Sequence, residues 1–407
     1  MKKLLMLGGT QFQIPAIKKA RELGHYVITC DEFENNPGHK CAHEYYSINI
    51  FDKDAVLTLA KELNIDGIIA YLSDSLAPIV AYVGEKLGLP SNPYKSVEII
   101  SNKEKFRNFL ANNQFNVPKA KGYNSFEEVK REIDHFKLPV IIKPVDSSGS
   151  RGVSKIESIE LLKEKVENAL SFSRAKRFIV EEFIENFGYQ VAADGFSVDG
   201  ELIFWCFGNG HFPPKYSNPV NPFVPVGSSW PSNMPERIQK KIHGVIQRLI
   251  TLLNMKTSAY NFDIQVDQQE NVYIVDIGAR NGGNKIPEMI KYATGVDLIE
   301  YSIKSSLGED CNDLTMNKPI GYWCSYLINS QNEGILKDIV IDEELKKTNI
   351  VEYELLINKG EKVSAYTGSN HKLGTMILKF SSMSEMLEKI ANMNNLLEVK
   401  VEDLGNV

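Results

Sequence analysis

Two aspartates whose side chains could share a metal ion lie in the stretch of residues 259–287. Apolar and polar residues alternate on both sides of a polar four-residue turn, as they do in two paired strands. If Asp267 faces Val272 across that turn, Asp263 lies directly opposite Asp276 on one face of the sheet. Two facing carboxylates repel each other unless a cation lies between them, and Mg²⁺ takes oxygen ligands of this kind. The spacing therefore predicts a metal site at Asp263 and Asp276; the alternative is an ordinary hairpin with exposed acids.

A cationic, glycine-rich segment follows the second aspartate. Arg280 lies four residues after Asp276, and Asn281-Gly282-Gly283 comes next. Glycines let backbone N–H groups approach an anion closely. Two acids for a metal, an arginine for charge and a glycine turn are typical of sites that transfer a phosphoryl group.

A lysine and a second glycine-rich loop indicate a phosphate site earlier in the chain. Residues 138–144 have the pattern of a buried strand that ends near Lys143, and residues 146–153 form a loop rich in serine and glycine. This loop joins two strands, unlike a Walker A loop, which opens a helix. Its N–H groups could cover phosphates as kinase loops do, with Lys143 acting as a point charge. We favour phosphate binding over a purely structural turn.

Lys103 is a further candidate ligand for phosphate. Ser101-Asn102-Lys103-Glu104 has the spacing of a capping box, with Ser101 as the N-cap of a helix. A lysine in the first turn opposes the helix dipole, and a bound anion would remove this penalty. The alternative is a solvated lysine.

The composition is that of an ordinary soluble globular protein. The 407 residues have a net charge of −6 and no basic block, so nothing in the composition favours nucleic-acid binding. A chain of this length is expected to form two to four subdomains. The five scattered cysteines form no CxxC motif and indicate reduced thiols. No apolar run is long enough for a membrane span or a signal peptide, so we expect a cytoplasmic protein.

The first hundred residues alternate predicted strands and helices, which favours a parallel sheet. The turn Gly8-Gly9-Thr10 lacks the third glycine of the dinucleotide-binding GxGxxG motif, but it is a candidate to approach a substrate at the carboxyl end of its strand. His39, Cys41 and His43 do not have the spacing of a structural zinc site, and we favour a surface loop there.

Residues 209–235 are predicted to form a long irregular loop with seven prolines. Loops of this length often shape a substrate pocket. His211, Lys215 and Trp230 are its candidate substrate contacts, and loop packing alone is the alternative. An amphipathic helix is predicted after the loop.

Taken in order along the chain, these motifs resemble the ATP-grasp superfamily. The resemblance rests on Lys103, Lys143, the loop at 146–153, Glu181-Glu182-Phe183-Ile184 and the Asp263/Asp276/Arg280 set, and it covers almost the whole chain. It implies an ATP-grasp fold of α/β and α+β class, in the branch that contains the biotin carboxylases and L-amino-acid ligases. The expected parts are a Rossmann-like pre-ATP-grasp domain with a parallel sheet (1–100), a small lobe with the glycine-rich loop (101–195), a large lobe with the metal site (196–310) and a C-terminal α+β domain (311–407).

The resemblance also implies a role for each candidate residue. Arg280 and Lys143 would be catalytic, and Asp263 and Asp276 would be the metal ligands, although glutamates are commoner at both positions. Gly278 stands where many members have a metal-binding asparagine, and Gln190 stands where a ribose-binding glutamate is common. Glu181 would bond the adenine amino group. The nucleotide-binding candidates are Lys103, Lys143, Ser147, Ser148, Gly149, Ser150, Gly152, Glu181, Glu182, Phe183, Ile184 and Gln190.

The function implied by the resemblance is an ADP-forming carboxylate–amine ligase that uses ATP and Mg²⁺, or Mn²⁺ in its place. A small carboxylate, such as an amino acid, would be activated as an acyl phosphate and joined to an amine. A homodimer is also expected from the resemblance, without a residue pattern that supports it. Two alternatives stay open: a carboxylase-type or carbamoyl-type enzyme that uses bicarbonate, and a nucleotide-binding protein without catalysis.

Overall fold

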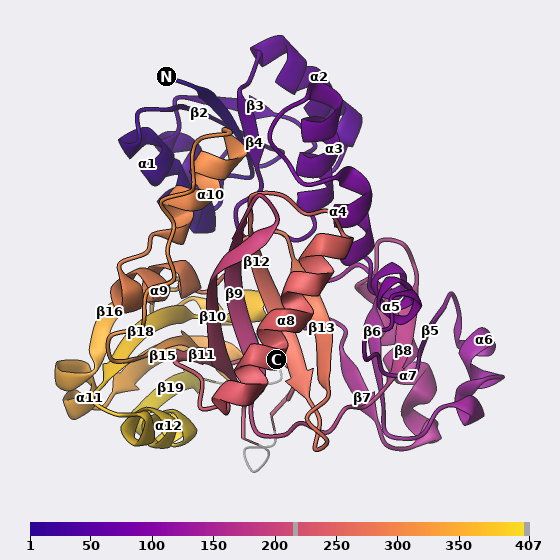
Figure 1. Ribbon diagram of the computed structural model, residues 1–407. Coiled ribbons are helices and arrows are strands. Elements are labelled where there is room, and N and C mark those ends of the chain that lie inside the picture. Colours follow the sequence, from indigo (N-terminus) through magenta and orange to yellow (C-terminus); the bar gives the residue numbers. More distant parts are fainter. Residues whose placement is uncertain (215–218, 403–407) are drawn as a thin grey trace.

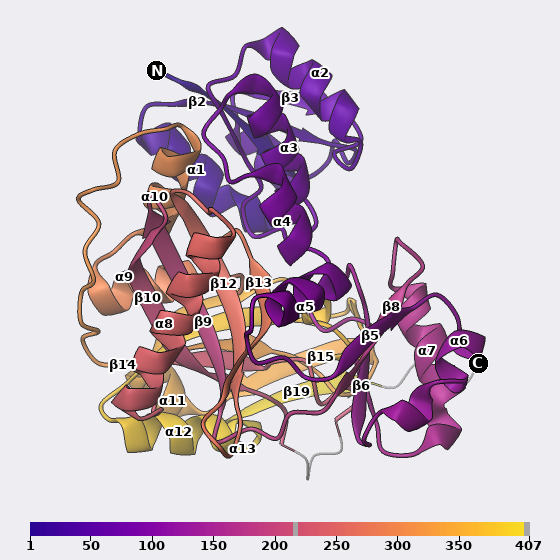
Figure 2. The ribbon, with the colours of Figure 1, turned by 45° about the vertical axis from the view of Figure 1, so that its right-hand side comes forward.

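The computed structural model describes residues 1–214 and 219–402, and their strands form four sheets (Figures 1 and 2). No helix within these two ranges is both long enough and apolar enough to cross a membrane.

The N-terminal unit, drawn in indigo and purple at the top of Figure 1, contains the predicted parallel sheet. Its strand order is β3, β2, β1, β4, and every pair is parallel. The strands are β1 (Lys3–Leu7), β2 (Tyr26–Asp31), β3 (Glu44–Ser47) and β4 (Gly67–Ile69). The helices are α1 (Ile14–Glu22), α2 (Lys53–Leu63), α3 (Ala77–Leu87) and α4 (Tyr94–Ile100).

The glycine turn after β1 packs against a buried histidine. A Cβ atom on Gly9 would lie 2.1 Å from the His39 ring, so only glycine fits there. The two His39 ring nitrogens lie 2.9 Å from Thr29 Oγ1 and 3.1 Å from the Phe33 carbonyl oxygen. The predicted surface loop is therefore wrong for His39, because its ring is part of the core beside β2.

Helix α5 (Lys103–Asn112) leads from the N-terminal unit into a small antiparallel sheet. The residue that caps it is Asn102, whose Oδ1 accepts a hydrogen bond from Lys105 N, so the predicted cap at Ser101 is wrong by one position. The small sheet has the order β5, β8, β6, β7. Its elements are β5 (Ala120–Tyr123), α6 (Phe126–Lys130), β6 (Val140–Pro144), β7 (Ser154–Ile156), α7 (Leu162–Ser171) and β8 (Phe178–Glu182).

The largest of the four sheets has eight strands, in the order β13, β12, β9, β10, β11, β14, β18, β16. Its strands are β9 (Gln190–Val198), β10 (Glu201–His211), β11 (Gly227–Trp230), β12 (Ser258–Val266), β13 (Val272–Gly278), β14 (Tyr322–Ile328), β16 (Ile350–Leu355) and β18 (Gly374–Phe380). The expected domain boundary at residue 195 falls inside β9, and strands from residues 311–407 extend the sheet of the expected large lobe. The division into four domains stays a prediction.

Helices and a short sheet cover this large sheet. Apolar residues of α8 (Glu236–Leu252) at helical spacing, from Ile238 to Ile250, are buried against it. A three-stranded sheet, in the order β17, β15, β19, lies at the C-terminal end. The remaining elements are α8 (Glu236–Leu252), α9 (Ile286–Thr294), α10 (Leu298–Ser306), β15 (Gly334–Ile341), α11 (Glu343–Thr348), β17 (Lys362–Val363), α12 (Met383–Ala391), α13 (Met393–Leu396) and β19 (Leu397–Glu402).

Helix α10 packs between the N-terminal unit and the large sheet. Ile299, Ile303 and Leu307 pack in one buried cluster with Leu4 and Met6 of β1. This contact sets the carboxyl ends of the N-terminal strands against the site described next.

Candidate functional site

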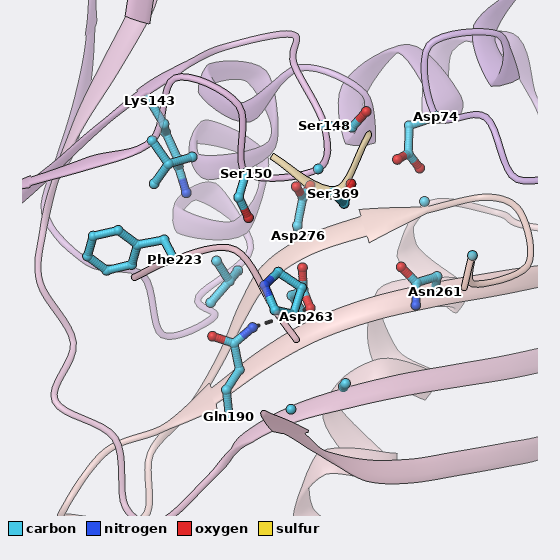
Figure 3. A pocket seen from close by; sticks show the side chains of 18 of the residues that line it. Asp74, Lys143, Ser148, Ser150, Gln190, Phe223, Asn261, Asp263, Asp276 and Ser369 are labelled. Atoms are coloured by element: carbon cyan, nitrogen blue, oxygen red, sulfur yellow. Dashed lines mark hydrogen bonds between the residues drawn. The ribbon is translucent and has the colours of Figure 1, made fainter. Parts of the chain in front are cut away.

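One cavity of about 690 Å³ receives side chains from all parts of the fold (Figure 3). This volume is within the range of small-molecule sites. The predicted site residues that line it are Lys103, Lys143, Ser147, Ser148, Gly149, Ser150, Glu181, Glu182, Phe183, Ile184, Gln190, Asp263, Asp276 and Arg280. Gly152 is not among the lining residues.

The two aspartates of the predicted metal site face each other, as expected, although the turn between their strands has a different register. Asp263 of β12 lies opposite Asp276 of β13, but closer to the turn Val266, not Asp267, faces Val272. A β-bulge between these two regions adds Val275 as an extra residue on β13. The extra residue offsets the one-residue change of register at the turn and keeps the aspartates opposed.

Arg107, which we did not assign to the site from sequence, holds this bulge. It is 4% exposed, and its Nη2 donates a hydrogen bond of 2.6 Å to the Val275 carbonyl oxygen. A weaker bond of 3.4 Å runs from Nη1 to the Ile274 carbonyl. Carbonyl groups at a bulge lose their partners in the sheet, and the guanidinium of Arg107 in α5 replaces them.

The two aspartates have different electrostatic surroundings, which shift their pKa values in opposite directions. Burial and the facing charge of Asp276 raise the pKa of Asp263 to about 6. Burial acts on Asp276 in the same direction, but the charges of Lys103 and Lys143 outweigh it and lower the pKa of Asp276. Lys103 Nζ lies 3.0 Å from Asp276 Oδ2.

The pair of acids fits a divalent cation that is completed by other oxygen ligands. Within residues 1–214 and 219–402, no group of three or more His, Cys, Asp and Glu side chains could hold a metal by itself. Mg²⁺ is commonly bound by one or two carboxylates together with phosphate oxygens and water. The donors Asp263 and Asp276 match that pattern.

Lys143 and Glu181 form a buried charge network with Arg107. Lys143 Nζ lies 2.7 Å from Glu181 Oε2, and Arg107 Nε lies 2.8 Å from Oε1. Burial lowers the pKa of Lys143, whereas the two cations outweigh burial and lower the pKa of Glu181. Both carboxylate oxygens of Glu181 therefore face cations, and its expected contact with adenine stays a prediction.

The glycine-rich loop has the backbone conformations that only glycine adopts easily. Gly149 and Gly152 have φ values of 67° and 73°. A Cβ on Gly152 would lie 3.0 Å from Pro144 and from Phe172, so this glycine packs under the loop instead of facing the cavity. At the tip, Ser369 N donates to the Gly149 carbonyl at 3.3 Å, which joins the loop to the C-terminal part of the chain.

Gln190, expected near the ribose, reaches toward Asp263 in this structure. Its Nε2 donates to Asp263 Oδ1 at 3.3 Å, as the dashed line in Figure 3 marks. A side-chain contact with ribose stays a prediction.

Arg280 forms an ion pair with Asp74 of the N-terminal unit. Arg280 Nη2 lies 2.6 Å from Asp74 Oδ2. Asp74 lies between β4 and α3, at the carboxyl edge of the parallel sheet, where open α/β sheets bind ligands. Sequence reasoning missed it, although its position after a short apolar strand was a usable signal. Phe12 and Gln13, after β1, also line the cavity, in place of the Gly8-Gly9-Thr10 turn.

The glycine turn after Arg280 is held by a buried carboxylate. Asp194 is 2% exposed, and its Oδ2 accepts a bond of 2.7 Å from Gly282 N. Asn261 Nδ2 donates to its Oδ1 at 2.8 Å. The Gly282 N–H is therefore already bonded within the protein, and the expectation that it meets a bound anion is wrong for this residue.

Two of the expected substrate contacts in residues 209–235 are core residues. His211 Nε2 lies 2.7 Å from Ser229 Oγ, and burial lowers the pKa of His211 to about 4. Trp230 is 4% exposed in β11, and neither residue lines the cavity. Lys215 lies outside the described residues. The cavity is lined instead by Phe212, Pro222, Phe223, Pro225, Gly227 and Ser228.

Comparison with known proteins agrees with this arrangement. Residues 136–288 match the family described as ATP-grasp domain. The L-amino acid ligase of Bacillus licheniformis superimposes with a TM-score of 0.85 at 20% identity over 99% of both chains. Phosphoribosylglycinamide synthetase of Anaerococcus prevotii gives a TM-score of 0.74 at 23% identity, covering 98% of this chain and 100% of that chain.

Among curated proteins, the formate-dependent phosphoribosylglycinamide formyltransferase of Prochlorococcus marinus is 32% identical over 52% of this chain and 54% of its own length. The chain thus spans about half the length of this relative and of two others of the same name. These likenesses confirm the predicted fold: the chain has the ATP-grasp fold, and residues 136–288 match the ATP-grasp domain family.

Proposed function

We propose that this protein is an ADP-forming ligase that activates a small carboxylate with ATP and joins it to an amine. The observation that carries the proposal is the set of charged side chains that line one cavity. The facing acids Asp263 and Asp276, the cations Lys103 and Lys143, and Arg280 all line it beneath the glycine-rich loop. This set supplies what a phosphoryl transfer needs, because such a reaction depends mainly on positioning and on neutralisation of charge.

Each group has a defined task in the proposed reaction. Asp263 and Asp276 would hold Mg²⁺, which neutralises the phosphates when bound. Lys103 and Lys143 would bind phosphate oxygens, and the N–H groups of the glycine-rich loop would cover them. Arg280 would bind the acyl phosphate and stabilise the charge that develops on the transferred phosphoryl group. No side chain is needed as a nucleophile.

The relatives supply two candidate substrate pairs. One is a pair of amino acids. The resemblance to the L-amino-acid ligases implies this pair, and the similar fold of the Bacillus licheniformis enzyme is consistent with it. The other is formate with phosphoribosylglycinamide, the pair in the name of the Prochlorococcus relative, and the sequence identity to that protein favours it. The pair of amino acids agrees with the amino-acid substrate that the resemblance in sequence implied.

The test is phosphate release from Mg-ATP in the presence of formate or one of the twenty amino acids, each with and without an amine or bicarbonate. Release of ADP and phosphate that needs an acid and an amine together supports the ligase. Release with bicarbonate alone would instead identify a bicarbonate-dependent enzyme. Binding of ATP without release under any condition would favour a nucleotide-binding protein without catalysis.

A further inference from the structure

Asp74 is placed in the cavity by a strained turn of the N-terminal unit. Leu72, two residues earlier, has a φ of 66°, a left-handed conformation that is rare for a leucine. Strained backbone of this kind gathers at functional sites, where the surrounding structure maintains it. Both Leu72 and Asp74 line the cavity, and Figure 3 shows Asp74 entering it from a different segment than Asp276.

The two carboxylate oxygens of Asp74 have different surroundings. Oδ2 forms the 2.6 Å ion pair with Arg280. Oδ1 is buried and has no hydrogen-bond partner within residues 1–214 and 219–402. Arg280 Nε is likewise buried without a partner in this part of the chain. A free acceptor and a free donor therefore lie on the two members of one ion pair, and buried polar atoms are normally bonded.

Gly278 has no side chain, and the free oxygen of Asp74 packs where a Cβ would otherwise be. A Cβ on this residue would lie 2.2 Å from Asp74 Oδ1 and 3.1 Å from Arg280 Nε. Any larger residue at 278 would displace the carboxylate. The glycine, the free acceptor and the free donor therefore form one small polar subsite at the edge of the cavity.

We propose that Asp74 Oδ1 binds the nitrogen of the amine substrate, while Arg280 holds the acyl phosphate beside it. The inference rests on the proposed ligase function and adds the position of the second substrate. A carboxylate oxygen accepts hydrogen bonds and attracts a cation, so its partner is a primary amine or ammonium. Oδ1 and Arg280 Nε face the same small space, which brings nucleophile and electrophile together.

The proposed step balances without a further reactant. An ammonium nitrogen loses one proton to Asp74 Oδ1, from which it passes to water. The free amine then attacks the carbonyl carbon of the acyl phosphate, and a C–N bond forms. The bond between that carbon and the phosphate oxygen breaks, and its electron pair leaves with the phosphate. The second proton of the nitrogen ends on the departing phosphate.

The experiment separates formation of the acyl phosphate from capture by the amine. Hydroxylamine at high concentration traps an acyl phosphate as a hydroxamate, and because it is mostly uncharged at neutral pH, it needs no carboxylate to remove a proton. Wild-type protein with Mg-ATP is first screened for hydroxamate with formate and the twenty amino acids. The accepted acid is then tested with the amino acids, glycinamide or ammonium as the nitrogen donor.

Asp74→Asn and Asp74→Glu are compared with wild type and with Glu34→Gln, a change at an exposed acid of the same unit that does not line the cavity. We expect kcat/KM for the amine to fall at least 100-fold in Asp74→Asn. Hydroxamate formation should fall less than tenfold, because Arg280 Nη1 keeps its 2.9 Å bond to the Asn281 carbonyl oxygen. Asp74→Glu should recover part of the amine reaction, and Glu34→Gln should match wild type.

Two results would overturn the inference while the ligase stands. An equal fall of both rates in Asp74→Asn would mean that Asp74 only positions Arg280, and an unchanged amine reaction would mean that it has no part in binding. Absence of hydroxamate from wild type with every acid would instead contradict the ligase itself, and the inference with it.

Discussion

Asp263→Asn should stabilise the metal-free protein while it destroys the proposed metal site. Burial and the facing carboxylate of Asp276 raise the pKa of Asp263 from 3.8 to about 6. The folded protein therefore holds this proton more tightly than the unfolded chain does. Well below pH 3.8 both states are protonated and the group has no effect on stability. Stability then falls as the pH rises from about 4 to 6, and the full penalty persists above pH 6.

The size of the penalty follows from the difference between the two pKa values. About 6 minus 3.8 is about 2 pH units, and at about 1.4 kcal/mol per unit this gives about 3 kcal/mol. Solvent reaches the cavity and screens part of this, so we expect a gain of about 1–3 kcal/mol for Asp263→Asn at pH 7.5. Asparagine keeps the Oδ1 that accepts the bond from Gln190.

The assay is urea unfolding at pH 7.5 and pH 4 in the presence of EDTA. Asp276→Asn is the matched control, because surrounding cations lower the pKa of Asp276 and its charge is favourable in the fold. The same chemical change should therefore have opposite signs at the two facing positions. A loss of stability in Asp263→Asn at pH 7.5, or a gain that is the same at pH 4, would refute the reasoning.

Three further predictions concern the rest of the site. Asp276→Ala should abolish ATP turnover, measured as phosphate release, and unchanged release would refute its assignment to the metal. Arg107→Met should lower the free energy of unfolding, measured by urea denaturation, by about 3–5 kcal/mol, because the Glu181 carboxylate and the carbonyl groups at the bulge lose a partner. The control is Arg131→Met, a change at an exposed arginine, and an equal or smaller loss in Arg107→Met would contradict this prediction. Gly152→Ala should raise KM for ATP several-fold, because its Cβ would contact Pro144 and Phe172, whereas Gly188→Ala, with a similar φ but no atom within 4 Å, should not; equal effects would mean that the packing is irrelevant.

Much of the site could be predicted because it depends on neighbours in sequence. Alternation and a polar turn are local signals, and they were sufficient to oppose Asp263 and Asp276 across one hairpin. The two aspartates are opposed although the predicted register at the turn is wrong by one residue, because the bulge at Val275 shifts the register back between the turn and the aspartates. The N-cap of α5, displaced by one residue, shows how little local sequence separates two adjacent candidates.

The sequence by itself determined many of the strands and helices, the order of the candidate phosphate-binding motifs and the pairing of the two acids, but residues 209–235, expected to be irregular, contain β11 and the end of β10. Only the tertiary structure decided that Arg107 supports the bulge 168 residues away and that Asp74 meets Arg280 across 206 residues. It also decided that His211 and Trp230 are buried while Phe212 and Phe223 face the cavity. Periodicity reports which face of an element is buried, but the partner of a buried charge depends on how distant elements pack, and no local pattern contains that information.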